Sequence, residues 1–120
     1  MGNSIVDNKS FCFAIRIVKL YRFLCDEKRE FVLSKQLLRC GTSIGANVRE
    51  ALQAQGKKDF LSKINIALKE ANESLYWIEL LYATDYINDK QKESIFVDCN
   101  EIVSLLVSIV KTTKRNLEGS

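Results

Sequence analysis

The 120-residue sequence contains no histidine and no proline. Histidine is the side chain that most often transfers protons near neutral pH, so its absence removes the commonest general acid or base. The sequence also lacks a glycine-rich phosphate loop, a nucleophile elbow and the carboxylate–histidine pairs of di-iron bundles. We therefore expect a protein that is not an enzyme and that uses no cofactor.

Long hydrophobic runs are also missing. The longest dense one spans residues 102–110, is interrupted by Ser104 and Ser108, and is far shorter than the roughly 20 residues that cross a bilayer. The N-terminus shows no basic stretch leading into an apolar one, so no secretory signal is expected. These features predict a cytoplasmic protein with no membrane contact.

The few cysteines are spread over the chain, at Cys12, Cys25, Cys40 and Cys99. No pair has the spacing of a zinc finger, and without histidine a tetrahedral site would need all four thiolates from distant elements. The favoured interpretation is that they are small buried residues in a reducing compartment, with no metal.

What the sequence does contain is helical periodicity. Apolar residues make up 47% of the chain and recur at helical spacing in four segments, and the absence of proline favours long helices with short links. In the third segment they alternate in steps of four and three, the seam of a bundle with shallow crossing angles. We predict an all-α, antiparallel up-down four-helix bundle, a single domain over residues 1–120 with helices at about 9–26, 30–55, 57–85 and 88–115.

Capping signals predict where these helices begin and end. Residues 1–8 carry little pattern and are expected to be a frayed lead-in, with Ser10 capping the first helix. Gly56 is expected to end the second helix in a left-handed conformation. Asn88 and Gln91 have the spacing of a capping box for the fourth.

The segment from Gly41 to Gly45 has two interpretations. Two glycines cost helix stability and could mark a break, or, being four apart, they could let a neighbouring backbone approach one helix face. The apolar stripe keeps its phase from Leu37 through Ile44 to Val48, which favours a continuous helix.

Blocks in the second and third segments resemble a known family. LSKQLLR at 33–39 and TSIGANV at 42–48, followed by KDF at 58–60 and EA at 70–71, resemble the signatures of the "four helix bundle protein" family. This is the S23 family, also called the 23S rRNA intervening-sequence proteins. The similarity extends from Phe11 to about Leu117.

The resemblance implies a bacterial, non-catalytic homopentamer associated with RNA or with a nucleic-acid enzyme. Relatives are encoded in insertions within 23S rRNA genes. A similar protein is the basic, pentameric accessory subunit of diversity-generating retroelements, which engages a reverse transcriptase. The expected partners are therefore other copies of the chain and RNA, DNA, or a reverse transcriptase-like or ribosomal protein.

The formal charge of +3 favours an anionic partner without requiring one. Three basic groups on expected solvent faces could contact nucleic acid, and because no base-reading motif is present any binding should be to the backbone. Alternatively they are solvated side chains, and the last group complements a helix dipole. The candidates are Arg16, Lys19, Arg22, Lys57, Lys58, Lys63, Lys111, Lys114 and Arg115.

The polar residues of the signature form a second set. The short link near Gly56 makes the second and third helices antiparallel. Residues whose numbers sum to about 112 then lie at the same level along the bundle axis, so Arg39 should pair with Glu70 or Glu73. The alternative is that Arg39 grips phosphate. The expected polar network comprises Arg39, Ser43, Asn47, Glu70 and Glu73.

The aromatic residues could stack on bases but are more typical of a core or a subunit interface. Tyr76 and Trp77 are adjacent and cannot both face the same core, so one is expected to contact a neighbouring subunit. The sequence thus predicts a non-catalytic, homo-oligomeric accessory protein that associates with nucleic acid. The alternative is a structural oligomer that binds none.

Overall fold

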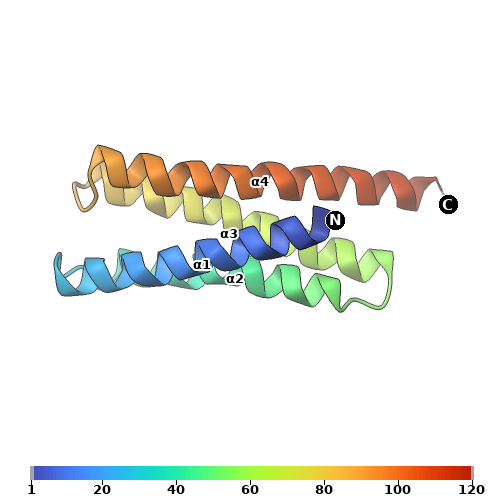
Figure 1. The fold of residues 1–120 in the computed structure, drawn as a ribbon, viewed down its shortest axis with the longest axis horizontal. Helices are drawn as coiled ribbons and strands as arrows, with labels where there is room; N and C mark the ends of the chain where they lie inside the picture. Colours follow the sequence, from blue (N-terminus) through green and yellow to red (C-terminus); the bar gives the residue numbers. More distant parts are fainter. Residues whose placement is uncertain (1, 120) are drawn as a thin grey trace.

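The computed structural model describes residues 2–119, with side chains from Ile5 onward, and contains four α-helices. They are α1 (Gly2–Asp26), α2 (Leu33–Leu52), α3 (Lys57–Ala83) and α4 (Asp89–Glu118). Successive helices run in opposite directions and form a rod of 52 × 22 × 21 Å (Figure 1). Because no strand occurs among the described residues, the predicted all-α up-down bundle is confirmed.

Each helix packs against the next along the chain, and α4 closes the bundle against α1. The interior is built from the apolar stripe of every helix, which is the arrangement that amphipathic helices need to remove their apolar faces from water. The largest fully buried side chains are Phe13, Ile17 and Leu24 of α1, Leu37, Ile44 and Val48 of α2, Ile64, Ile78 and Leu81 of α3, and Ile102 and Leu106 of α4.

The start of α1 differs from the prediction. The helix begins at Gly2, not at residue 9, and Val6 is buried one heptad before Phe13, so the apolar stripe starts earlier than the sequence suggested. Ser10 is no cap, because it lies inside the helix, fully buried, and its Oγ donates a hydrogen bond to the carbonyl of Asp7 at 3.1 Å. The predicted lead-in is therefore wrong for the described residues 2–8.

The links between helices correct one expectation and confirm another. Gly56 is extended (φ −158°, ψ 172°) and precedes α3, whereas α2 already ends at Leu52. Left-handed backbone occurs instead at Arg29 and Asp85, in the other two links. The capping box of α4 is present, with the Gln91 amide donating to Asn88 Oδ1 at 2.8 Å and the Asn88 amide donating to Gln91 Oε1 at 2.9 Å.

The two glycines of α2 lie within one continuous helix and face α1. A Cβ atom at Gly41 would lie 2.9 Å from Cγ1 of Ile17, which is fully buried and cannot move aside easily. A Cβ atom at Gly45 would lie 3.4 Å from the Ser10 carbonyl oxygen, which is ordinary van der Waals contact. Close approach of two helices, not a break, therefore explains Gly41.

The N-terminus of α2 is capped by a side chain that the sequence did not reveal. The Glu30 carboxylate accepts hydrogen bonds from the backbone amides of Val32 (3.1 Å), Leu33 (3.0 Å) and Ser34 (2.7 Å), and Ser34 Oγ donates to the Glu30 carbonyl at 2.8 Å. Burial by itself would raise the pKa of Glu30, but these amide donors outweigh it and hold the pKa below its usual value.

Substituting the two glycines separately tests the close approach of α1 and α2. Gly41→Ala is expected to lower the free energy of unfolding by about 1–3 kcal/mol, because the added methyl overpacks Ile17. Gly45→Ala has room, so the gain in helix propensity should leave it neutral or up to about 1 kcal/mol more stable. Urea denaturation followed by circular dichroism measures both, and equal effects would contradict the packing.

Removing the carboxylate of Glu30 tests the cap of α2. Glu30→Ala should cost about 1–2 kcal/mol at pH 7, the usual range for a lost helix cap. Because the folded pKa is lowered, the stabilisation is present above the unfolded value of about 4.3 and is lost as pH falls through the folded pKa. The difference between wild type and variant should therefore shrink below pH 4 in urea titrations, and a difference that grows there would contradict the cap.

Candidate nucleic-acid interface

The basic side chains of the bundle fall into a paired group and an unpaired group. The paired group joins neighbouring helices, and one carboxylate or more lies against each cation. The cross-helix ion pairs are Lys9–Glu101, Arg16–Asp98, Arg39–Glu70 (3.2 Å), Arg39–Glu73, Arg49–Asp7 (3.0 Å) and Lys63–Glu50 (3.3 Å).

Arg16 is one of the predicted nucleic-acid residues, and its guanidinium is occupied. Nη1 pairs with Asp98 and also lies 3.3 Å from the Ser94 carbonyl, while Nη2 donates to Ser94 Oγ at 2.8 Å. Together with Lys63, which pairs with Glu50, it connects helices. Both residues stabilise the bundle. The α2–α3 register whose residue numbers sum to about 112 already brings Lys63 to Glu50, whereas no local signal connects Arg16 to its partners on α4.

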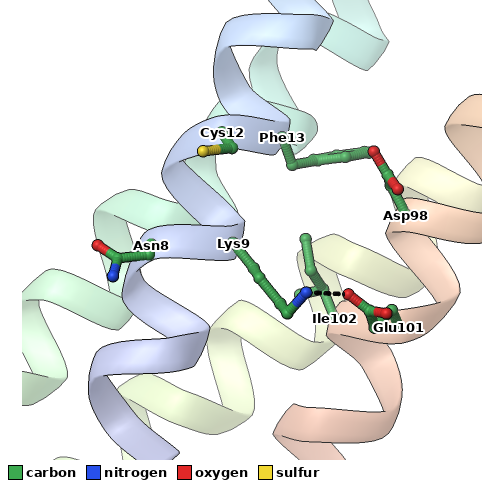
Figure 2. A pocket seen from close by; sticks show the side chains of 7 residues that line it. All are labelled: Asn8, Lys9, Cys12, Phe13, Asp98, Glu101 and Ile102. Carbon is green, nitrogen blue, oxygen red and sulfur yellow. Dashed lines mark ion pairs between the residues drawn. The ribbon is translucent and has the colours of Figure 1, made fainter.

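A hollow of about 250 Å³ lies beside these pairs, between α1 and α4. Figure 2 shows Lys9 of α1 reaching across to Glu101 of α4, with Cys12 and Phe13 on the α1 side and Asp98 and Ile102 on the α4 side. The hydrogen bond from Lys9 to Glu101 raises the pKa of the ammonium, which therefore stays charged. The ion pair that lines this hollow already balances its two charges.

The unpaired group lies at both ends of the bundle. Lys28, Arg29, Lys35, Lys90 and Lys92 form no ion pair with a described residue and lie at the end where α2 and α4 begin, and a second cluster lies at the other end. Lys57 and Lys58 begin α3, Lys111, Lys114 and Arg115 lie near the end of α4, and the antiparallel helices bring these two segments to the same end (Figure 1). All five side chains are exposed, and no carboxylate among the described residues forms an ion pair with them. We call these five residues the basic end.

The remaining candidates lie elsewhere. Lys19 and Arg22 are exposed near the end of α1, at the opposite end of the rod, and form no ion pair with a described residue. The structure therefore does not bring all nine predicted residues together. It separates them into the basic end, the α1 pair and two residues used in packing.

The predicted polar network lies on the outer seam of α2 and α3. Arg39 contacts both Glu70 and Glu73, as the antiparallel register predicts, and Trp77 Nε1 donates to Glu73 Oε2 at 3.1 Å. Glu70 is only 9% exposed, so Arg39 neutralises a largely buried carboxylate. This network stabilises the α2–α3 contact. Because the Arg39 guanidinium already binds two carboxylates, the structure favours a structural role over phosphate binding.

The other two members of the network bond within α2. Ser43 Oγ donates to the Arg39 carbonyl at 2.7 Å, and Asn47 Nδ2 donates to the Ser43 carbonyl at 2.9 Å. In the described part of the chain, no hydrogen bond links either side chain to α3. The expected patch is therefore a ladder along one helix and not a bridge between two.

Two buried thiols lie in the core beneath this network. Burial raises the pKa of Cys99 to about 12, and burial also raises the pKa of Cys40, so both stay protonated and unreactive. Cys40 Sγ lies 3.3 Å from Ser74 Oγ, whose proton is donated to the Glu70 carbonyl at 2.8 Å. The prediction of buried cysteines holds for these two, whereas Cys25 is only half-buried and Cys12 is exposed.

Tyr76 and Trp77 point to different sides of α3, as adjacent residues of a helix must. Trp77 is half-buried against the core, whereas Tyr76 is 57% exposed and meets the Trp77 ring edge-on, with ring centroids 5.0 Å apart. Tyr76 is thus the more exposed of the two.

No described helix combines the length and the apolar character needed to cross a membrane. The fold and its surface define a small antiparallel four-helix bundle with paired charges along its seams and a basic end. The chain belongs to the 23S rRNA-intervening sequence protein family, whose model matches residues 2–108. The resemblance seen in the sequence is thereby confirmed.

A solved structure agrees with this assignment. The chain is similar to a protein of unknown function from the S23 ribosomal protein family of Bacteroides thetaiotaomicron, with 60% sequence identity and a TM-score of 0.91. The match covers 92% of this chain and 99% of that one. No curated protein matches the chain.

Replacing Arg39 tests whether it is a structural residue. Arg39→Ala should lower the free energy of unfolding by about 1–2 kcal/mol, because it leaves Glu70 without its cation. Lys35→Ala removes an exposed cation one turn earlier on α2 and should change stability by less than about 0.5 kcal/mol. Thermal melts compare the two variants, and equal Tm values would contradict the structural role.

Proposed function

We propose that the protein is a non-catalytic, homo-oligomeric accessory protein that associates with RNA or DNA through its basic end. The observation that carries the proposal is the separation of the cations. Those along the helix seams are neutralised by carboxylates, whereas Lys57, Lys58, Lys111, Lys114 and Arg115 are not. Unneutralised surface cations are the groups that phosphates attract.

The family description supports an RNA setting, since it refers to an intervening sequence of 23S rRNA. The basic end presents lysine and arginine on helix surfaces, with no base-reading motif beside them. Binding is therefore to the sugar-phosphate backbone and tolerates any sequence. The biological partner is a nucleic acid or an enzyme that processes one.

Self-association would bring several copies of the basic end together in one assembly. One protomer offers only a few phosphate contacts, but several copies around an axis repeat the basic end and gain avidity. Large apolar side chains exposed on the outer faces of α1 and α3 support such contacts, with Phe11 48%, Ile15 43% and Tyr76 57% exposed. We propose a homopentamer, the assembly that the family resemblance implies.

A salt titration tests the nucleic-acid association. Fluorescence anisotropy of the purified protein with a labelled RNA or DNA duplex should give an affinity whose logarithm falls linearly with the logarithm of salt concentration, by about 0.9 for each phosphate neutralised. Duplexes of unrelated sequence should give the same slope. Absent binding at low salt would contradict the proposal and favour the alternative, a structural oligomer.

Light scattering tests the assembly independently. The wild-type chain should elute with a mass near five times its 13.7 kDa. Tyr76→Lys should shift the mass toward the protomer, because it places a charge in an apolar contact, whereas Lys35→Ala should not. A wild-type protein that is monomeric at micromolar concentration would contradict the oligomer.

A further inference from the structure

The last four turns of α4 have an unusual outer surface. Residues 102–117 include three cations and no carboxylate, although acidic residues are frequent elsewhere in the chain. Apart from Asn116, the exposed residues of this stretch are hydroxyl or cationic: Ser104, Ser108, Lys111, Thr112, Lys114 and Arg115. The nearest carboxylates on this face lie at its two limits: Glu101, which pairs with Lys9, is one turn before Ser104, and Glu118 is one turn after Arg115.

Most of these residues share one shallow hollow. It has a volume of about 420 Å³ and is lined by Val103, Ser104, Val107, Ser108, Lys111, Thr112 and Arg115. Ser104, Ser108, Lys111 and Arg115 follow steps of four, three and four residues, so they lie in a row along one helix face. At 1.5 Å per residue the row is about 16 Å long. We call these four residues and Thr112 the α4 strip.

The hydroxyls of the strip differ from most of those elsewhere in the bundle, although Ser62 of α3 is also exposed and donates no hydrogen bond to a described residue. Thr42, Ser43, Ser74, Thr84 and Thr113 each donate to a carbonyl one turn earlier, at 2.7 to 2.8 Å. Ser104, Ser108 and Thr112 form no such bond with any described residue. Their protons are therefore directed to solvent and can be donated to an incoming acceptor.

The favourable interaction of cations with the C-terminal end of the α4 helix dipole does not account for this surface. A cation stabilises a helix C-terminus mainly within the last turn, which here includes Arg115. Lys111 lies almost two turns before the end of the helix, and the hydroxyls at Ser104 and Ser108 lie further away still. The dipole therefore accounts for Arg115 and not for Lys111 or the hydroxyls.

We propose that the α4 strip binds the phosphodiester backbone of an RNA or DNA strand lying along α4. Lysine, arginine, serine and threonine are the side chains that contact phosphate most often, and the strip consists of these types alone. A row of about 16 Å is long enough to contact more than one phosphate of the same strand. The inference rests on the proposed function and assigns it to one surface.

Within the strip the two kinds of donor have different tasks. Lys111 and Arg115 displace counterions from the phosphates, so they determine how binding depends on salt. The hydroxyls are neutral and supply short hydrogen bonds that fix the position of the strand, without changing the number of counterions released. Val103 and Val107, beside them in the hollow, offer apolar contact to the sugars.

Two sets of variants separate these tasks in the anisotropy assay with duplex. Lys111→Gln with Arg115→Gln should reduce the salt slope by about 1.8, twice the value for one phosphate. Ser104→Ala with Ser108→Ala and Thr112→Ala should weaken binding several-fold at every salt concentration and leave the slope unchanged. The matched control, Lys35→Gln with Lys90→Gln, removes two exposed cations from the opposite end and should bind like wild type.

The outcomes distinguish this inference from the proposed function. If the charge variant binds the duplex with the affinity and salt slope of the wild type, the assignment to the α4 strip is wrong and the proposed function stands. No wild-type binding at any salt would overturn both. Hydroxyl variants with wild-type affinity and unaltered Tm would also contradict the strip.

A membrane surface carries phosphates too, so the same proteins are tested on vesicles of phosphatidylserine and phosphatidylcholine in a sedimentation assay. The inference expects no wild-type binding to vesicles at the salt concentration where the duplex is bound. Vesicle binding as strong as duplex binding, and lost in the charge variant, would assign the strip to lipid headgroups and overturn the nucleic-acid assignment.

Discussion

Burial of one continuous apolar seam is the constraint on which the rest of the bundle depends. Each helix shares its stripe with two neighbours, and at Gly41 the backbone of α2 approaches Ile17 so closely that a side chain would not fit without rearrangement. Once the stripes are buried, every charged residue is forced to the rim of a helix contact or to the solvent face. The distribution of charge is thus a consequence of the packing.

The rims and the solvent face then have different roles. At the rims, cations meet carboxylates of the adjacent helix, as in Arg16 with Asp98 and Arg39 with Glu70, and these pairs reinforce the antiparallel order. Toward the end of the rod where α3 begins and α4 ends, the cations have no carboxylate partner among the described residues. Asp59 and Glu118 offset part of this charge, so the end is locally basic to about the extent of the whole chain's net charge of +3.

Local and periodic features of the fold could be predicted from the sequence. The apolar stripes fix four helices, the pairing around a short link brings Arg39 to Glu70 and Glu73, and the spacing of Asn88 and Gln91 identifies a capping box. These predictions succeed because each depends on residues close in sequence or on one antiparallel register.

The failures have physical causes. The first turn of α1 was missed because Val6 alone extends the stripe. Glu30 was missed because a glutamate three residues before a helix rarely serves as its cap. Arg16 was misassigned because its partners lie on α4, some 80 residues away, and no local signal gives that register. The uncovered hydroxyls of the α4 strip could not be told from back-bonded ones until the structure showed which serines and threonines are satisfied.

The central claim is that the charge left unpaired by packing marks the surface that meets nucleic acid. Hydrogen–deuterium exchange of the protein, alone and with saturating RNA, tests it most directly because it maps contact along the whole chain. The account predicts slower exchange confined to the last turns of α4 and the start of α3. Protection along the α2–α3 seam instead, or none under conditions where RNA is bound, would contradict it.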